Sequence, residues 1–319
     1  MQISIILKGM AMGIAEAIPG VSGGTIAFIT GIYERLLAAI GGILGPKVVG
    51  SWRKEGLAAA WTAADGGFIL QLGVGMVLGL GIAVFSITEL LEMYPPVVWA
   101  FFFGLIIASA VYIGKQITRW NAVTIGLLVL GAAFAFWLTT INPLAGSSSP
   151  FLVFLAGAIA ITALILPGIS GSFILLLLGM YTVVLTSVKE MAGDTGSLAT
   201  VAFFALGCLV GLAVFSRVIT YTFKTFPNQT MALLTGFMLG SLRTLWPWQN
   251  VLKTRINSSG EEVPFLQQPV LPGAYAGEST FLVGVVIAFL AGLALVYFMD
   301  RFGPPVQKEV EVLKEVVEE

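Results

Sequence analysis

The chain has 319 residues, of which 57% are hydrophobic and 10% are charged, and its mean hydropathy is +0.97. Because a soluble domain carries about 25% charged residues, this composition predicts an integral membrane protein. The net charge of −1, without a basic block, argues against nucleic acid as a partner. A single cysteine, Cys208, and the lack of histidine exclude an intramolecular disulfide, Cys/His metal sites and Ser-His-Asp or Cys-His catalysis.

The first apolar run, 3–43, is broken near its middle at Pro19-Gly20-Val21-Ser22-Gly23-Gly24. Proline removes a helix hydrogen bond and glycine lowers helix propensity, so we expect two half-helices around a non-helical tip. Lys8 and Glu16 interrupt the apolar stretch, and we expect it to be mature structure rather than a signal peptide.

After this hairpin, an insertion at 44–66 is expected to place a helix in the membrane interface. Trp52, Arg53, Lys54 and Trp61 are the residue types that favour the lipid–water boundary. Three apolar runs of roughly 20 residues, the length that crosses a bilayer, are predicted as spans at 68–90, 97–114 and 122–140. These segments complete a first half, 1–145.

The second half, 146–302, has the same order of segments. Its apolar hairpin, 150–188, is broken at Pro167-Gly168-Ile169-Ser170-Gly171-Ser172, and three spans are predicted at 199–222, 229–246 and 280–299. Residues 250–279 are predicted to be a polar external loop. Residues 303–319 are predicted to be a cytoplasmic acidic tail.

Both breaks belong to a longer internal repeat, because 19–33 matches 167–181 and 81–86 matches 211–216. Each half has three crossings if its hairpin is re-entrant and five if both half-helices cross the bilayer. Either odd number inverts the second half, and the lysine and arginine bias places both termini in the cytoplasm. The sequence therefore predicts an all-α integral membrane protein of two inverted-topology repeats, each a broken re-entrant hairpin followed by three transmembrane helices.

Paired interrupted segments at equivalent positions are a sequence sign of a transporter's central site. A half-helix that starts at each tip would point its N-terminal N–H groups at the membrane interior and attract an anion. We therefore predict a phosphate or carboxylate site, with no catalytic residue, metal or cofactor. We assign substrate binding to Glu16, Gly20, Ser22, Gly23, Gly24, Thr25, Arg35, Gly168, Ser170, Gly171, Ser172 and Arg217.

Three charged residues of this set also have structural interpretations. Glu16 lies one turn before the first tip, where it would carry a proton, partner an arginine or cap the tip's own N–H groups. Arg35 and Arg217 would each meet a phosphate. Alternatively, Arg35 pairs with the adjacent Glu34 at the interface, and Arg217 extends its charge toward the cytoplasmic face.

The segments 13–36, GIAEAIPGVSGGTIAFITGIYERL, and 166–172, LPGISGS, closely resemble the bacterial DUF368 family, the PopT-type polyprenyl-phosphate transporters. The resemblance covers about 1–302. It implies a flippase that moves undecaprenyl phosphate, the carrier lipid of cell-wall synthesis, from the outer to the inner leaflet of the bacterial plasma membrane. By the same resemblance, the functional positions of the family are expected at Glu16, Ser22, Arg35 and Ser170. Its expected partners are the transported lipid and the surrounding membrane lipids. The resemblance leaves open whether transport is coupled to an ion or proton and whether the chain forms a homo-oligomer.

Two other functions fit part of the pattern. Undecaprenyl-diphosphate phosphatases of the bacitracin-resistance type also have inverted repeats with Pro-Gly-x-Ser tips, but with an arginine between two serines and with paired acidic residues. Here the second tip has no arginine and Glu16 stands alone, whereas phosphoryl transfer needs arginine or a metal to neutralise charge. A small-anion secondary transporter is the other alternative. We therefore expect a transporter and not an enzyme.

Overall fold

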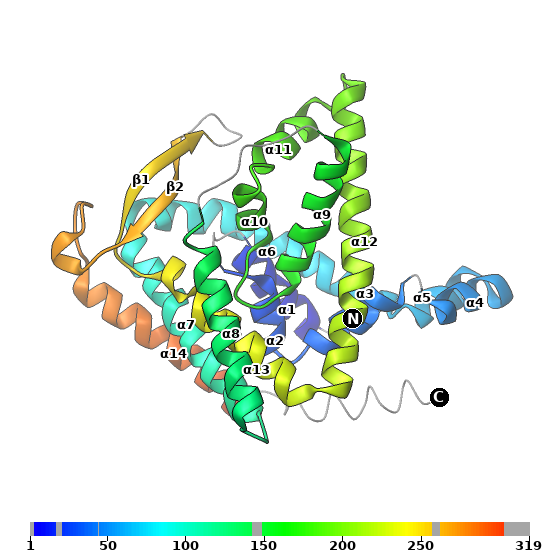
Figure 1. Cartoon of the computed structure of the whole chain (residues 1–319), viewed down its shortest axis with the longest axis horizontal. Helices are drawn as coiled ribbons and strands as arrows, with labels where there is room; N and C mark the ends of the chain where they lie inside the picture. Colours follow the sequence, from blue (N-terminus) through cyan, green and yellow to red (C-terminus); the bar gives the residue numbers. More distant parts are fainter. Residues whose placement is uncertain (1–2, 17–20, 44, 142–148, 257–261, 303–319) are drawn as a thin grey trace.

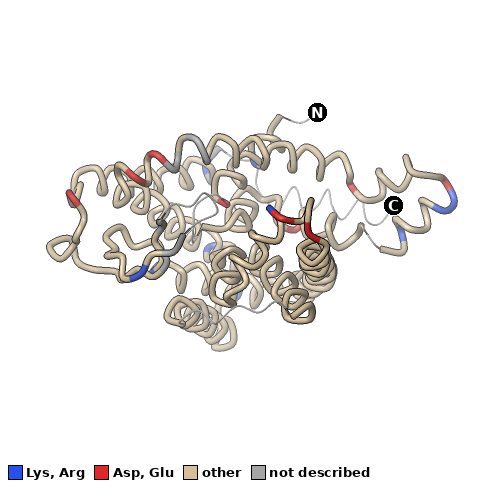
Figure 2. The backbone as a smooth tube through the Cα atoms, turned by 90° about the horizontal axis from the view of Figure 1, so that it is seen from above, with Lys and Arg blue, Asp and Glu red and all other residues tan. Residues whose placement is uncertain are grey.

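The computed structural model describes residues 3–16, 21–43, 45–141, 149–256 and 262–302, and most of them are helical. The first half contains eight helices in the described residues: α1 (Ile3–Glu16), α2 (Gly23–Ile29), α3 (Tyr33–Gly42), α4 (Pro46–Glu55), α5 (Leu57–Ala63), α6 (Gly66–Met93), α7 (Pro95–Gln116) and α8 (Ala122–Leu138). Helices α4 and α5 project sideways from the bundle (Figure 1). Lysine and arginine positions gather at this projecting end (Figure 2).

The second half has the same order of long helices. It consists of α9 (Pro150–Ile165), α10 (Gly171–Leu177), α11 (Tyr181–Glu190), α12 (Thr195–Thr225), α13 (Pro227–Ser241), η1 (Leu242–Leu245), β1 (Gln249–Ile256), β2 (Glu262–Pro269), η2 (Pro272–Ala274) and α14 (Leu282–Phe302). In Figure 1, α12 runs from α11 at the top of the view to α13 at the bottom, and β1 and β2 lie near the top.

The segment expected to be a polar loop, 250–279, instead contributes most of an antiparallel hairpin. Gln249 of β1 is opposite Pro269 of β2, and the register shifts on either side of Lys253. Valine, threonine and isoleucine recur along β1, and such β-branched residues favour extended backbone. The fold is therefore helical apart from this hairpin, as far as the described residues go.

Among the described residues, four helices are long and apolar enough to cross a bilayer: they fall within α6, α7, α12 and α14. The pairs α2–α3 and α10–α11 each pass the same test together but are bent by 117° and 105°. Helices α8 and α9 are apolar but shorter. Little of the apolar surface of α12 and α14 is covered by the protein. The chain is therefore a multi-pass membrane protein, with lipid as the natural cover for these faces.

The bends within the two hairpins have one physical cause. Gly31 and Gly179, each directly after the C-cap residue of a short helix, have φ angles of +76° and +68°. At the first bend the amides of Gly31 and Ile32 donate to carbonyls of the preceding turn, and the second bend has the same pair of bonds. This is the glycine-ended helix terminus known as the Schellman motif, and it turns the chain sharply. Each apolar run thus has a second break that the sequence analysis did not anticipate.

Glycines let pairs of helices approach closely. Gly75 and Gly79 of α6 leave no room for a Cβ because backbone of α1 lies against them, and Gly207 and Gly211 of α12 meet α9 in the same way. Helix α8 packs on α13, and α7 packs on α14. The second long helix of each half therefore packs on the third long helix of the other half. This packing brings the two halves together around the hairpin tips.

Candidate functional site

The first tip is capped by side chains of its own hairpin. Ser22 has extended backbone and precedes α2, and its Oγ accepts a hydrogen bond of 3.1 Å from the Gly24 amide. The Gly23 amide donates to Glu16 Oε1 at 2.6 Å. Glu16 is the last residue of α1, and its carboxylate accepts from one of the amides that the start of α2 leaves without a partner in the helix. The tip amides of Gly23 and Gly24 therefore have internal partners in this state.

The two tips contact each other directly. The buried Ser22 hydroxyl lies 3.1 Å from the Leu164 carbonyl oxygen and 3.2 Å from that of Leu166, and it can donate to either. In return, the Gly168 amide donates to Thr25 Oγ1 at 3.1 Å. A Cβ at Gly24 would collide with the Ile165 carbonyl oxygen. The tips are thus joined by side-chain-to-backbone hydrogen bonds and by the absence of a side chain at one position.

Glycine also shapes the second tip. Gly168 has a φ of +83°, and a Cβ there would lie 2.7 Å from the Cα of Met238 on α13. A Cβ at Gly171 would lie 2.6 Å from the Ala160 carbonyl oxygen. The positive φ and the two close approaches explain why this tip needs glycine. Ser170 precedes α10 as Ser22 precedes α2, but its Oγ lies 2.9 Å from the Ser172 hydroxyl instead of capping the helix.

A cavity adjoins the second tip. Its empty volume is about 310 Å³, including the open space at its mouth. It lies between the tip, α8, α10 and the end of α13, and its lining residues are Ala135, Leu138, Thr139, Gly168, Ile169, Ser170, Phe173, Ser241 and Thr244. Four of these nine residues carry hydroxyl groups. The site can therefore offer a small polar patch within a mostly apolar wall, to which both halves contribute.

Arg243 contacts one of the cavity's lining residues, Thr139. Its Nη1 donates to the main-chain carbonyl of Thr139 at 2.9 Å and lies 3.4 Å from the Thr139 hydroxyl. Its guanidinium carbon is 5.8 Å from the centre of the Phe136 ring. Thr139 and Thr244, the residue after Arg243, both line the cavity. The guanidinium is therefore bonded to one residue of the cavity wall, Thr139 at the end of α8.

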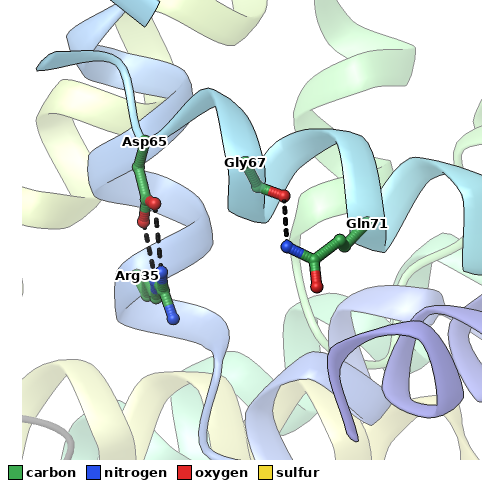
Figure 3. Close-up of polar contacts among 4 residues, drawn as sticks. All are labelled: Arg35, Asp65, Gly67 and Gln71. Atoms are coloured by element: carbon green, nitrogen blue, oxygen red, sulfur yellow. Dashed lines mark hydrogen bonds and ion pairs between the residues drawn. The ribbon is translucent and has the colours of Figure 1, made fainter. Parts of the chain in front are cut away.

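The other two arginines assigned to the site contact other groups. Arg35 pairs with Asp65 through an Nε–Oδ2 contact of 2.7 Å and an Nη2–Oδ1 contact of 3.0 Å (Figure 3). Its guanidinium also lies 4.3 Å from the centre of the Phe68 ring. Arg217 is exposed on α12, with its Cγ near Gly41 of α3. The Arg35 pair joins α3 to the start of α6, so the expected pairing with Glu34 is replaced by one with Asp65.

The structure brings together most of the predicted site residues. Glu16 and residues 22–25 lie at the joined tips, where Thr25 is bonded to Gly168. Ser170 lines the adjacent cavity. Gly20 lies outside the described residues. Sequence analysis did not single out Thr139, Ser241 and Thr244, because hydroxyl residues near helix ends are common. The one available signal was that Ser241, Arg243 and Thr244 cluster near the end of the predicted span 229–246.

The fold and the joined tips define a helical multi-pass membrane protein with two broken hairpins that meet at one place. The VCA0040-like family, described as undecaprenyl phosphate translocase-like, matches residues 12–263, and the chain belongs to this family. The family resemblance seen in the sequence is thereby confirmed.

Two relatives extend the comparison. The chain is 41% identical over 304 residues to a polyprenyl-phosphate transporter of Vibrio cholerae serotype O1, which covers 94% of this chain and 96% of the relative. It is 32% identical over 255 residues to a polyprenyl-phosphate transporter of Staphylococcus aureus, covering 76% of this chain and 85% of the relative. No solved structure matches the chain significantly. Both relatives are named as transporters, in agreement with the expectation that the chain is not an enzyme.

Proposed function

We propose that this protein moves a polyprenyl phosphate, undecaprenyl phosphate in particular, from the outer to the inner leaflet of the bacterial plasma membrane. Family membership and the names of both relatives support the substrate class. The direction follows from the biology that the family resemblance implies, in which the carrier lipid is recovered for reuse.

The observation that carries the proposal is the contact between the two tips beside a small cavity. Ligand sites place a few polar groups within a mostly apolar lining, and the hydroxyl residues of this small cavity would suit a polar headgroup and not a long lipid tail. The polyprenyl chain would then lie along the lipid-facing surfaces of the helices. A lipid phosphate needs this combination of a polar site inside the protein and an apolar exit for its tail.

We propose that the two halves are inverted repeats, with both termini in the cytoplasm. The matched helix order and the packing of α1 on α6 and of α9 on α12 support two equivalent units. Transporters built from such repeats expose a central site to each side in turn. Here the tips are asymmetric, because Glu16 and Ser22 cap the first tip whereas Ser170 of the second tip lines the cavity. We propose that these contacts belong to a state in which the lipid headgroup would approach beside the second tip.

Exchange between two such states would break few bonds. Ser22 and Thr25 provide the hydrogen bonds that join the tips, and a net hydrogen bond is worth about 0.5–1.5 kcal/mol. The Gly23 and Gly24 amides are bonded to Glu16 and Ser22 within the first hairpin, so a phosphate would also have to displace these two side chains. We propose that these amides then bind the lipid phosphate from the other side.

The proposal is tested with purified protein in liposomes that contain a labelled undecaprenyl phosphate. We expect faster exchange of the lipid between leaflets than in protein-free liposomes, without release of inorganic phosphate. A phosphate-releasing activity on undecaprenyl diphosphate, sustained in magnesium or calcium, would replace transport with catalysis. Liposomes that move inorganic phosphate but not the lipid would favour the small-anion transporter.

A further inference from the structure

Arg243 has hydrogen-bonding capacity that the described protein does not use. Nη1 is engaged by Thr139, but Nε and Nη2 have no hydrogen-bond partner among the described residues. Arg243 is also partly buried and has no carboxylate partner within that part of the chain. A guanidinium presents five N–H groups in a planar fork that matches the oxygens of phosphate. The free edge of this side chain is therefore suited to an anion.

The surroundings of Arg243 point to the same ligand. Thr139 and Thr244 place hydroxyl groups at the cavity, and Ser170 adds a third from the second tip. Each threonine hydroxyl bonds a carbonyl oxygen of its own segment, Thr139 to Phe136 and Thr244 to Ser241, while Ser170 pairs with Ser172. Hydroxyls rotate, so these groups can turn toward an anion that enters the cavity.

The first half has no positive charge at the position that corresponds to Arg243. Alignment of the repeat through Ser109 and Ser241 places Val111 at the position of Arg243 in the first half. Val111 is exposed on α7 and carries no charge. The first half therefore lacks an equivalent cation, so an anion would be attracted on the side of η1 and the β1–β2 hairpin.

We propose that Arg243, with the hydroxyls of Ser170 and Thr244, binds the phosphate monoester headgroup of the transported lipid in the cavity beside the second tip. This inference rests on the proposed function and adds the residue that captures the substrate. The carbonyl of Thr139 orients the guanidinium, whose remaining N–H groups contact two phosphate oxygens. The same chemistry would accept inorganic phosphate, which lacks only the tail. Because 250–279 is predicted to be external, the arginine loads the site from the outer leaflet.

The test measures binding of a polyprenyl phosphate to purified protein, with inorganic phosphate as a separate ligand and competitor. Arg243→Gln should weaken binding of the lipid by about tenfold or more, the loss expected for hydrogen bonds to a charged group. Thr244→Val, which preserves side-chain shape, should weaken it several-fold. Lys253→Gln is the matched control: it removes one exposed positive charge from β1 and should bind as the wild type does.

Separate results decide the inference and the proposed function. If the wild type neither binds nor moves a polyprenyl phosphate, the proposed function is wrong. If the wild type binds the lipid and a folded Arg243→Gln variant binds it equally well, the inference about Arg243 is wrong. Should Arg243→Gln fail to fold, Thr244→Val and Ser170→Ala decide, and wild-type affinity in both would refute the site. Inorganic phosphate that binds more tightly than the lipid would show a free-anion site instead of a headgroup site.

Discussion

Replacing Ser22 by alanine tests how the two tips are held together. The hydroxyl caps α2 by accepting from the Gly24 amide and donates to a carbonyl of the other hairpin. Loss of a serine N-cap costs about 1 kcal/mol. A buried polar group left without a partner costs about 1–3 kcal/mol. Ser22 is fully buried, so water cannot replace the hydroxyl, and Ser22→Ala should lower the free energy of unfolding by about 2–4 kcal/mol.

Ser109→Ala is a matched control for this change. Ser109 is equally buried, but among the described residues its hydroxyl bonds only the Leu105 carbonyl, one turn earlier in α7. That carbonyl keeps its helix partner, so removal of the hydroxyl should cost less than about 1 kcal/mol. Unfolding of the detergent-solubilised variants, followed by circular dichroism, measures the difference. Equal stability of the two variants would refute the description of Ser22 as the link between the tips.

Three further predictions concern Glu16, Tyr33 and the topology. Glu16→Gln retains an oxygen for the tip amide and should fold in wild-type amounts, whereas Glu16→Ala orphans that amide and should lose about 1–3 kcal/mol of stability; equal stability of the two variants would contradict the cap. The buried Tyr33 hydroxyl has no partner among the described residues, so Tyr33→Phe should raise the melting temperature, and a lowered one would reveal an unseen partner. In a Cys208→Ala background, single cysteines at Ser51 and Glu278 should react with membrane-impermeant reagent from opposite sides; reaction from one side would refute the inverted arrangement.

The sequence predicted the breaks in both hairpins because proline and glycine act locally. The Pro-Gly tips could be placed from residue type alone, and the repeat showed that they are equivalent. The bends at Gly31 and Gly179 were part of the same repeat. They became recognisable only from the positive φ angles, since glycine in an apolar run is equally common in straight membrane helices.

The partners of the site residues could not be predicted. Ser22 contacts backbone carbonyls more than 140 positions away, and any residue type supplies a carbonyl. Arg35 pairs with Asp65 and not with its neighbour Glu34. Asp65 follows the α4–α5 insertion, and the chain returns to α3 there, at the start of α6. The cavity beside Ser170 depends on where α8 and α13 pack, and that packing is not encoded in a local motif.

The most direct test of the account compares a charged lipid with its neutral counterpart. Liposomes containing the protein would carry labelled undecaprenyl phosphate and, in parallel, labelled undecaprenol, which has the same tail without the phosphate. If the joined tips and the adjacent cavity recognise the headgroup, the protein should accelerate leaflet exchange of the phosphate lipid only. Equal acceleration of both lipids would contradict headgroup recognition, and no acceleration of either would contradict transport.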